Sequence, residues 1–183
     1  MGAGVIPFAV LDSTVYFLFQ STFSGRKTGY LIDFGGGLGE GEGYRQTAVR
    51  EFVEETETMY FSGDQQRACR DDEQVNSQIP IVESLFEKTL APYPDWWCDR
   101  LPPKRWRTYF IEFPYREVES MNLAWQQDAT GRFKKRRELN WVSADDLLYL
   151  YEYMPERLWK RVRQLDQAPE LIRRIVSVKR QNP

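Results

Sequence analysis

Six of the twelve glycines in this 183-residue chain fall within the nine positions from Gly35 to Gly43. So many glycines favour a flexible loop over a helix interior, because glycine loses the most conformational freedom on ordering. The pattern then becomes helical from about Gly43 to Thr58, with a buried stripe formed by Ala48, Val49, Phe52 and Val53. The sequence therefore predicts a glycine-rich loop that leads directly into an amphipathic helix.

The other face of this helix carries three carboxylates, Glu51, Glu54 and Glu55. At about 100° per residue they lie within about 100° of arc, where like charges repel one another. A divalent cation would turn that repulsion into attraction, and oxygen ligands without His or Cys indicate Mg²⁺ or Mn²⁺. Arg50 could brace a carboxylate or a phosphate through its two-pronged guanidinium.

Composition removes several kinds of chemistry. The chain has no histidine, which excludes Ser-His-Asp and Cys-His triads, His-bound zinc and imidazole bases. Cys69 and Cys98 are too few for a disulfide framework, and a net charge of −2 gives no general attraction to nucleic acid or anionic membranes. No basic segment resembles the start of a signal peptide, and no apolar run approaches the roughly 20 residues of a membrane span. We expect a cytoplasmic protein with no membrane partner.

Strand and helix patterns alternate along the chain, which predicts an α/β fold. We expect one domain over residues 1–183, because no linker or repeat interrupts the pattern. Residues 60–78 look like a polar loop or a variable insertion, and 79–89 fit either a strand or a helix. The predicted strands are 4–10 and 14–20 (a hairpin), 29–34, 105–113 and 138–142, and the later helices are 117–127, 144–151 and 155–165, with a further helix after Pro169.

The glycine loop and acidic helix match neither G-x-x-x-x-G-K-[ST] nor G-x-G-x-x-G. They resemble the Nudix box, G-x5-E-x7-R-E-U-x-E-E-x-G-U, in which U is a bulky apolar residue. Seven positions are in register: Gly36, Glu42, Arg50, Glu51, Phe52, Glu54 and Glu55.

The resemblance implies an α/β/α sandwich around a mixed β-sheet and hydrolysis of a nucleoside diphosphate linked to another group. It departs at two positions, since Glu57 replaces the terminal glycine and Thr58 replaces an apolar residue. Without that glycine we expect the helix to run on towards Tyr60.

By the same resemblance, Glu51 and Glu55 are the principal ligands of Mg²⁺ or Mn²⁺. Glu54 assists them, and the carbonyl of Gly36 or its neighbour Gly35 is a further ligand. Glu42 and Arg50 orient these groups. Because there is no histidine, the base that activates water is Glu51 or a glutamate outside the motif. The outside candidates are Glu138, which precedes a Trp-Val strand, and the weaker alternative Glu112.

Aromatic and basic residues interleave around Trp97, Arg105 and Arg107, which suits stacking on a base and pairing with phosphate. Packing of the tryptophans against the sheet is the alternative. The basic run 134–137 fits a polyanion contact or, in preference, a solvated loop. The helix 155–165 has a core stripe of Leu158, Val162 and Leu165, with its basic residues, Arg157, Lys160, Arg161 and Arg163, facing outward.

The leading hypothesis is a metal-dependent Nudix hydrolase acting on a small-molecule phosphoanhydride, with capped RNA the only nucleic acid expected as a substrate and a homodimer possible. The alternative is a catalytically silent Nudix-fold module that binds nucleotides or regulates a partner. A Ca²⁺-binding protein without chemistry is disfavoured because no D-x-[DN]-x-[DN]-G loop occurs. The substrate stays open among nucleotide sugars, ADP-ribose, dinucleoside polyphosphates, oxidised nucleotides, RNA caps and inositol pyrophosphates.

Overall fold

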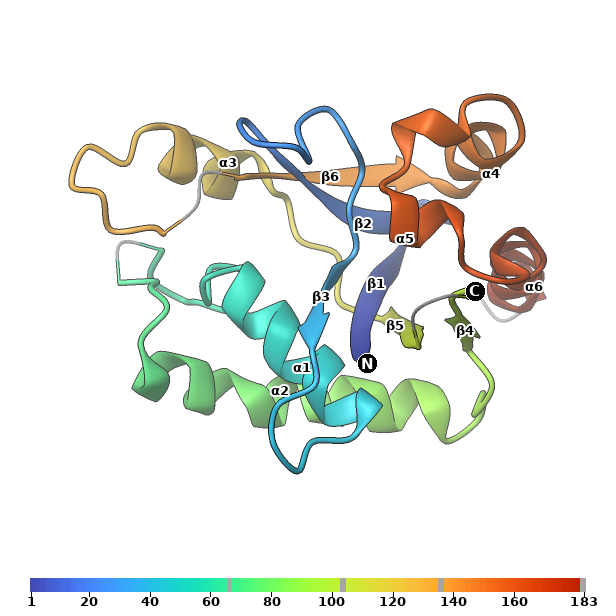
Figure 1. The fold of residues 1–183 in the computed structure, drawn as a ribbon, viewed down its shortest axis with the longest axis horizontal. Helices are drawn as coiled ribbons and strands as arrows, with labels where there is room; N and C mark the ends of the chain where they lie inside the picture. Colours follow the sequence, from blue (N-terminus) through green and yellow to red (C-terminus); the bar gives the residue numbers. More distant parts are fainter. Residues whose placement is uncertain (66, 103–104, 135–136, 182–183) are drawn as a thin grey trace.

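The computed structural model describes residues 1–65, 67–102, 105–134 and 137–181. Its centre is a six-stranded mixed sheet in the order β4-β5-β1-β2-β6, with β3 beside β1 (Figure 1). β1 runs parallel to β5, and the other pairings are antiparallel. The strands are β1 (Gly2–Leu11), β2 (Thr14–Thr22), β3 (Phe34–Gly37), β4 (Trp97–Asp99), β5 (Trp106–Glu112) and β6 (Arg137–Ser143).

Helices cover both faces of the sheet (Figure 1). One core includes Val53, Phe86 and Trp125 from the helices of the first face, and a second core includes Leu147, Val162 and Ile172 from those of the other. The predicted α/β/α sandwich is therefore confirmed. The first face carries α1 (Tyr44–Glu55), α2 (Asp72–Leu90) and α3 (Glu119–Gln126), and the other carries α4 (Ala144–Tyr153), the 3₁₀ turn η1 (Pro155–Arg157), α5 (Lys160–Arg163) and α6 (Ala168–Gln181).

Strand β1 divides one of its edges between two partners. Its first residues, Gly2–Val5, pair with β3, and its last residues pair with β2 in the predicted hairpin. The third strand is therefore not the predicted 29–34, where only isolated bridges form, but Phe34–Gly37, within the glycine run itself. Glycines can form this strand because Gly2, Ala3 and Gly4 opposite them leave space for close approach.

Helix α2 begins inside the segment predicted to be a loop. The Asp71 side chain caps it by accepting a hydrogen bond from Gln74 N at 2.8 Å, and Asp72 and Glu73 fill the acidic first turn. The run of acidic residues is thus a helix start, and 79–89 continues as helix through Pro80. The predicted helix 155–165 is broken into η1 and α5, although its stripe of Leu158, Val162 and Leu165 is buried as expected.

Helix α1 ends at Glu55, so the expected extension towards Tyr60 is wrong. Glu57 and Thr58 adopt the left-handed conformation, with φ of 49° and 61°, and Thr58 N donates to Val53 O at 3.1 Å. The turn that glycine would normally supply therefore forms without glycine. It is strained, because two non-glycine residues adopt the left-handed backbone conformation.

No helix in the part of the chain that the structure describes is long and apolar enough to cross a membrane.

The β1–β2 turn offers a test of backbone strain. Asp12 and Ser13 are exposed and have φ of 48° and 62°, the pattern of a type I′ turn that favours glycine. We expect Ser13→Gly to raise the free energy of unfolding by roughly 0.5 kcal/mol, because relief of the left-handed strain exceeds the added chain entropy. Thermal unfolding should show a midpoint about 1–2 °C higher.

The control is Ser177→Gly, at an exposed position inside α6. It should lower the free energy of unfolding by roughly 0.5 kcal/mol, because glycine is a poor helix former. A loss of stability in both variants would contradict the turn assignment.

Candidate active site

The Arg50 guanidinium gathers the acidic residues of the motif. Its Nε and Nη2 donate to the two carboxylate oxygens of Glu42 at 2.8 and 3.0 Å. Its Nη1 donates to Glu51 Oε1 at 2.8 Å and to Glu54 Oε2 at 3.2 Å, and Nη2 reaches the carbonyl of Gly37 at 3.2 Å. One cation thus joins the glycine strand, its following loop and helix α1.

Helix α1 lies close to β3, and the Glu51 carboxylate occupies the space that a side chain at position 36 would fill. A Cβ on Gly36 would lie 2.2 Å from Glu51 Oε1. The side chain of Glu51 is 15% exposed, and burial raises its pKa, with the charges of Glu55 and Glu54 acting in the same direction and Arg50 opposing them. The Glu51 carboxylate is therefore confined between Arg50 and the glycine strand.

Glu55 is held by a different set of groups. Its Oε2 accepts from Gly35 N at 2.7 Å and from Gln20 Nε2 at 2.6 Å. The other end of the Gln20 amide, Oε1, accepts from Arg137 Nη1 at 2.6 Å. Gln20 therefore links the Glu55 carboxylate of α1 to a buried arginine at the start of β6.

Glu54 and Glu42 have further partners. Glu54 Oε2 also accepts from Arg70 Nη2 at 2.7 Å. Glu42 accepts from Gly39 N at 2.9 Å and Thr47 Oγ1 at 2.8 Å in addition to Arg50. The hydrogen bond from Arg50 is the main reason that the pKa of Glu42 falls to about 2. Glu42 is thus a structural anion that fixes Arg50.

The donor set fits a hard divalent cation in its chemistry, since Glu51, Glu54 and Glu55 offer oxygen ligands and the glycine strand adds backbone carbonyls beside them. Among the described residues, no three Asp, Glu, Cys or His side chains are gathered closely enough to enclose a metal ion. Glu51 and Glu54 contact arginine, whereas Glu55 contacts Gln20 and Gly35 N.

Glu138 is not brought to this cluster. Side chains alternate along β6, and the residues on either side of it, Arg137 and Leu139, face helix α1 or its core. Glu138 instead lines a separate depression of about 570 Å³ with Asn140 and Val142. The sheet therefore separates it from Glu51. Glu112 is also elsewhere, since Lys179 Nζ of α6 contacts its Oε2 at 2.5 Å.

The predicted substrate contacts have partners within the protein. The Arg107 guanidinium lies 3.4 Å from the centre of the Trp97 ring and makes two hydrogen bonds with Asp99, at 2.9 and 3.1 Å. Arg105 is exposed, and its carbonyl accepts from Gly2 N at 3.1 Å. Arg107 and Trp97 therefore already contact each other within the protein, whereas the side chain of Arg105 is exposed.

The basic run 134–137 is only partly described, because residues 135 and 136 lie outside the described ranges. Arg137 contradicts the solvated loop that we predicted there, because it is only 3% exposed. Its burial follows from its place as the first residue of β6, opposite Thr22 and hydrogen-bonded to Gln20.

Glu57 is also buried, at 1% exposure, directly after α1. Its carboxylate accepts from Lys134 N at 2.9 Å and from Trp125 Nε1 at 3.4 Å. The residue that interrupts the motif thus ties the end of α1 to α3 and to the segment before β6.

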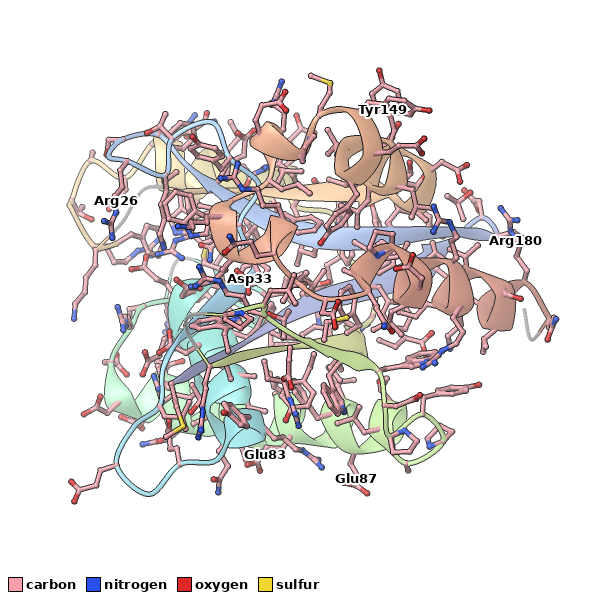
Figure 2. All side chains as sticks on the ribbon, turned by 45° about the vertical axis from the view of Figure 1, so that its right-hand side comes forward. Arg26, Asp33, Glu83, Glu87, Tyr149 and Arg180 are labelled. Carbon is pink, nitrogen blue, oxygen red and sulfur yellow. The ribbon has the colours of Figure 1, made fainter. Side chains whose placement is uncertain are left out.

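A second buried pair fixes the entry to β3. Asp33 is fully buried near the centre of the molecule (Figure 2), and its Oδ1 accepts from Arg161 Nε at 2.5 Å. Thr108 Oγ1 donates to Asp33 Oδ2 at 3.2 Å, and Arg161 lies 4.2 Å from the centre of the Trp106 ring. The expected outward position of Arg161 is therefore wrong, because this arginine neutralises the charge that precedes the glycine strand.

Sequence reasoning missed Gln20, Asp33, Arg70 and the burial of Arg137. Gln20 carried a usable signal, since it is a polar residue that ends the otherwise apolar run Val15-Tyr16-Phe17-Leu18-Phe19. The partners of Asp33 and Arg70 are 128 and 16 residues away, so local patterns could not identify them.

The three strand glycines predict different responses to alanine. In Gly35→Ala the new Cβ would lie 2.4 Å from the Ala3 carbonyl oxygen, so we expect a loss of about 1–3 kcal/mol in the free energy of unfolding. In Gly36→Ala it would meet only the Glu51 side chain, which should move away and leave stability within about 1 kcal/mol. Gly37→Ala is the control, because nothing lies within 4 Å. Denaturant unfolding measures all three, and equal losses at Gly35 and Gly37 would contradict the strand packing.

The pKa of Glu42 predicts how its contribution to stability depends on pH. Because the folded value is lowered from 4.5 to about 2, its contribution is complete above pH 4.5 and is lost as the pH falls towards 2. Glu42→Gln should therefore destabilise the protein most above pH 4.5, and the difference from wild type should narrow below it. Urea unfolding at several pH values measures this, with the exposed Glu40→Gln as the control. A difference that does not narrow would contradict the ion pair.

Comparison with known proteins gives structural likeness without sequence likeness. The chain matches no family model and no curated protein. The C. elegans Ap4A hydrolase, in a binary complex, superposes with a TM-score of 0.51 at 12% identity over 97% of each chain. A Nudix hydrolase from M. smegmatis, RenU, gives a TM-score of 0.43 at 14% identity over 100% of this chain and 87% of its own. The first of these likenesses, together with the mixed sheet and its two helical layers, shows that this chain has the fold of the C. elegans Ap4A hydrolase.

Proposed function

We propose that this protein is a metal-dependent Nudix hydrolase that cleaves a phosphoanhydride bond in a nucleoside diphosphate linked to another group. The observation that carries the proposal is the placement of Glu51 and Glu55 against the glycine strand, with Glu54 joined to Glu51 through Arg50. A structural helix face would not need a carboxylate packed against a bare backbone.

In this proposal, Glu51, Glu54 and Glu55, with the carbonyl of Gly36, would hold Mg²⁺ or Mn²⁺. When bound, such an ion activates water and neutralises charge on the phosphates. The chain's own residues prepare the site. Glu42 holds Arg50 by two hydrogen bonds, and Arg50 in turn orients Glu51 and Glu54.

Glu51 is the proposed base for the attacking water. Glu54 is contacted by two arginines, and Glu55 is held by Gln20 and Gly35 N. Among the three α1 carboxylates, Glu51 has a single hydrogen-bond partner in the described structure, Arg50. Glu138, on the opposite face of the sheet, is not proposed as the base.

Because the substrate class is open, a panel of candidate substrates is assayed. The exposed Arg105 is proposed to contact the substrate at the surface of the protein. Nucleotide sugars, ADP-ribose, dinucleoside polyphosphates, oxidised nucleoside triphosphates, capped RNA and inositol pyrophosphates are incubated with Mg²⁺ or Mn²⁺, and phosphate-containing products are measured. The Ap4A hydrolase activity named for one structural neighbour makes dinucleoside polyphosphates the first class to assay.

One observation favours a catalytically silent nucleotide-binding module as the second candidate. Arg50 contacts both Glu51 and Glu54, and Arg70 also contacts Glu54, so two of the three carboxylates are already paired with cations. If no member of the panel is hydrolysed while a nucleotide binds, the silent module replaces the enzyme.

Glu51→Gln should reduce the turnover of the best substrate by about 10²–10⁴-fold, because it removes the base and a metal ligand. The double variant Glu54→Gln/Glu55→Gln should be at least as impaired. Both are measured by initial rates at saturating metal, with the fold checked by circular dichroism.

Two variants serve as matched controls. Glu40→Gln changes an exposed glutamate of the glycine loop and should retain wild-type rates. Glu138→Gln should also retain them, because Glu138 lies across the sheet. Unchanged turnover in Glu51→Gln, or a large loss in Glu138→Gln, would overturn the assignment of the base.

A further inference from the structure

A small depression beside Glu55 contains cationic groups that the motif does not include. It has a volume of about 220 Å³, and its wall includes Thr22, Arg26, Lys27, Glu55 and Arg137. We call it the Arg137 pocket. Three cationic side chains and one carboxylate line it, so the pocket favours an anion.

The Arg137 pocket contains buried polar groups without partners. Arg137 is 3% exposed, and its Nη1 donates to Gln20, but its Nε has no hydrogen-bond partner among the described residues. The hydroxyl of Thr22 in the same wall is also buried and unpartnered within the described ranges. Buried donors are normally satisfied, so both groups indicate a ligand that supplies acceptors.

The charges around Arg137 do not remove this need. Burial lowers the pKa of Arg137, while the carboxylates of Glu55 and Glu57 favour its charged form. Neither carboxylate forms a hydrogen bond with it: Glu55 Oε2 accepts from Gln20 and Gly35, and Glu57 accepts from Lys134 N and Trp125. The Arg137 guanidinium in the pocket wall thus keeps a donor, Nε, without a hydrogen-bond partner among the described residues.

The size of the pocket selects the kind of anion. About 220 Å³ is smaller than the roughly 300–1,000 Å³ of pockets that bury a drug-sized ligand. A phosphate group fits this space, carries several acceptor oxygens and matches the planar guanidinium by paired hydrogen bonds. A nucleobase would offer no negative charge to Arg26 and Lys27.

We propose that the Arg137 pocket binds a phosphate group of the substrate next to the α1 carboxylates. This rests on the proposed function, because the phosphate belongs to the molecule that Glu51, Glu54 and Glu55 would act on. Glu55 lines the pocket and is joined to Arg137 through the Gln20 amide, with hydrogen bonds of 2.6 Å on each side. A phosphate held there lies beside the carboxylate cluster, and Arg137, Arg26 and Thr22 become binding residues outside the motif.

Isothermal titration calorimetry of the full chain with inorganic pyrophosphate, in metal-depleted buffer, tests the pocket without turnover. We expect measurable binding to the wild type and a loss of about tenfold or more in Arg137→Gln, because a hydrogen bond from a charged donor is removed. Arg26→Gln should weaken binding about two- to fivefold, since this side chain is exposed. Thr22→Val should also weaken it.

The matched control is Arg180→Gln, which removes another exposed arginine, from α6. Figure 2 shows Arg26 and Arg180 at opposite edges of the molecule. Arg180→Gln should bind pyrophosphate as the wild type does. Because Arg137→Gln removes a buried side chain and can unfold the protein, Arg26→Gln and Thr22→Val keep the test decisive.

The outcomes separate the pocket from the proposed function. Absence of pyrophosphate binding, or equal weakening in Arg26→Gln and Arg180→Gln, overturns the pocket. Binding that depends on Arg26 and Thr22 in a protein that hydrolyses nothing supports the pocket and overturns the enzyme. Hydrolysis with an unchanged KM in Arg26→Gln and Thr22→Val supports the enzyme and overturns the pocket.

Discussion

The approach of helix α1 to strand β3 is the constraint on which the rest of this site depends. A glutamate carboxylate occupies the space where Gly36 would carry a side chain, and this is possible only because β3 is made almost entirely of glycine. Strand β3 is held in place by β1, which pairs with it over Gly2–Val5. The elements pack closely here through backbone atoms, whereas in the two cores they pack through large side chains.

Charge balance follows from that contact. Three glutamates confined on one helix face need nearby cations, and the protein supplies Arg50 from the same helix and Arg70 from the loop before α2. Arg50 contacts several acceptors, and Arg70 connects the segment before α2 to Glu54. The acidic face of α1 therefore also fixes the position of neighbouring segments. The Asp33–Arg161 pair performs the same task for the entry to β3, where a charge would otherwise be buried alone.

The sequence was sufficient for the architecture and for the motif, because both rest on local spacing. The β1–β2 hairpin, β5, β6 and α1 could be placed from periodicity, and the register of Arg50 with Glu51 to Glu55 required only counting. It was insufficient where the outcome depended on distant partners. Nothing near Arg137 in the sequence indicates burial, since that burial depends on Gln20 of β2. For Glu138, the sequence could not show on which face of the sheet the side chain lies, because that depends on how β6 pairs with β2.

The left-handed turn after α1 has a consequence for how this protein can change. A glycine at position 57 would make no demand on its surroundings. The glutamate found there needs Lys134 N and Trp125 Nε1 to satisfy its buried carboxylate, and these groups belong to segments about seventy residues further along the chain. The effect on stability of a substitution in the 125–134 segment therefore depends on the residue at the end of α1, and the reverse is also true. Residues far from α1 in the sequence thus help to determine where this helix ends.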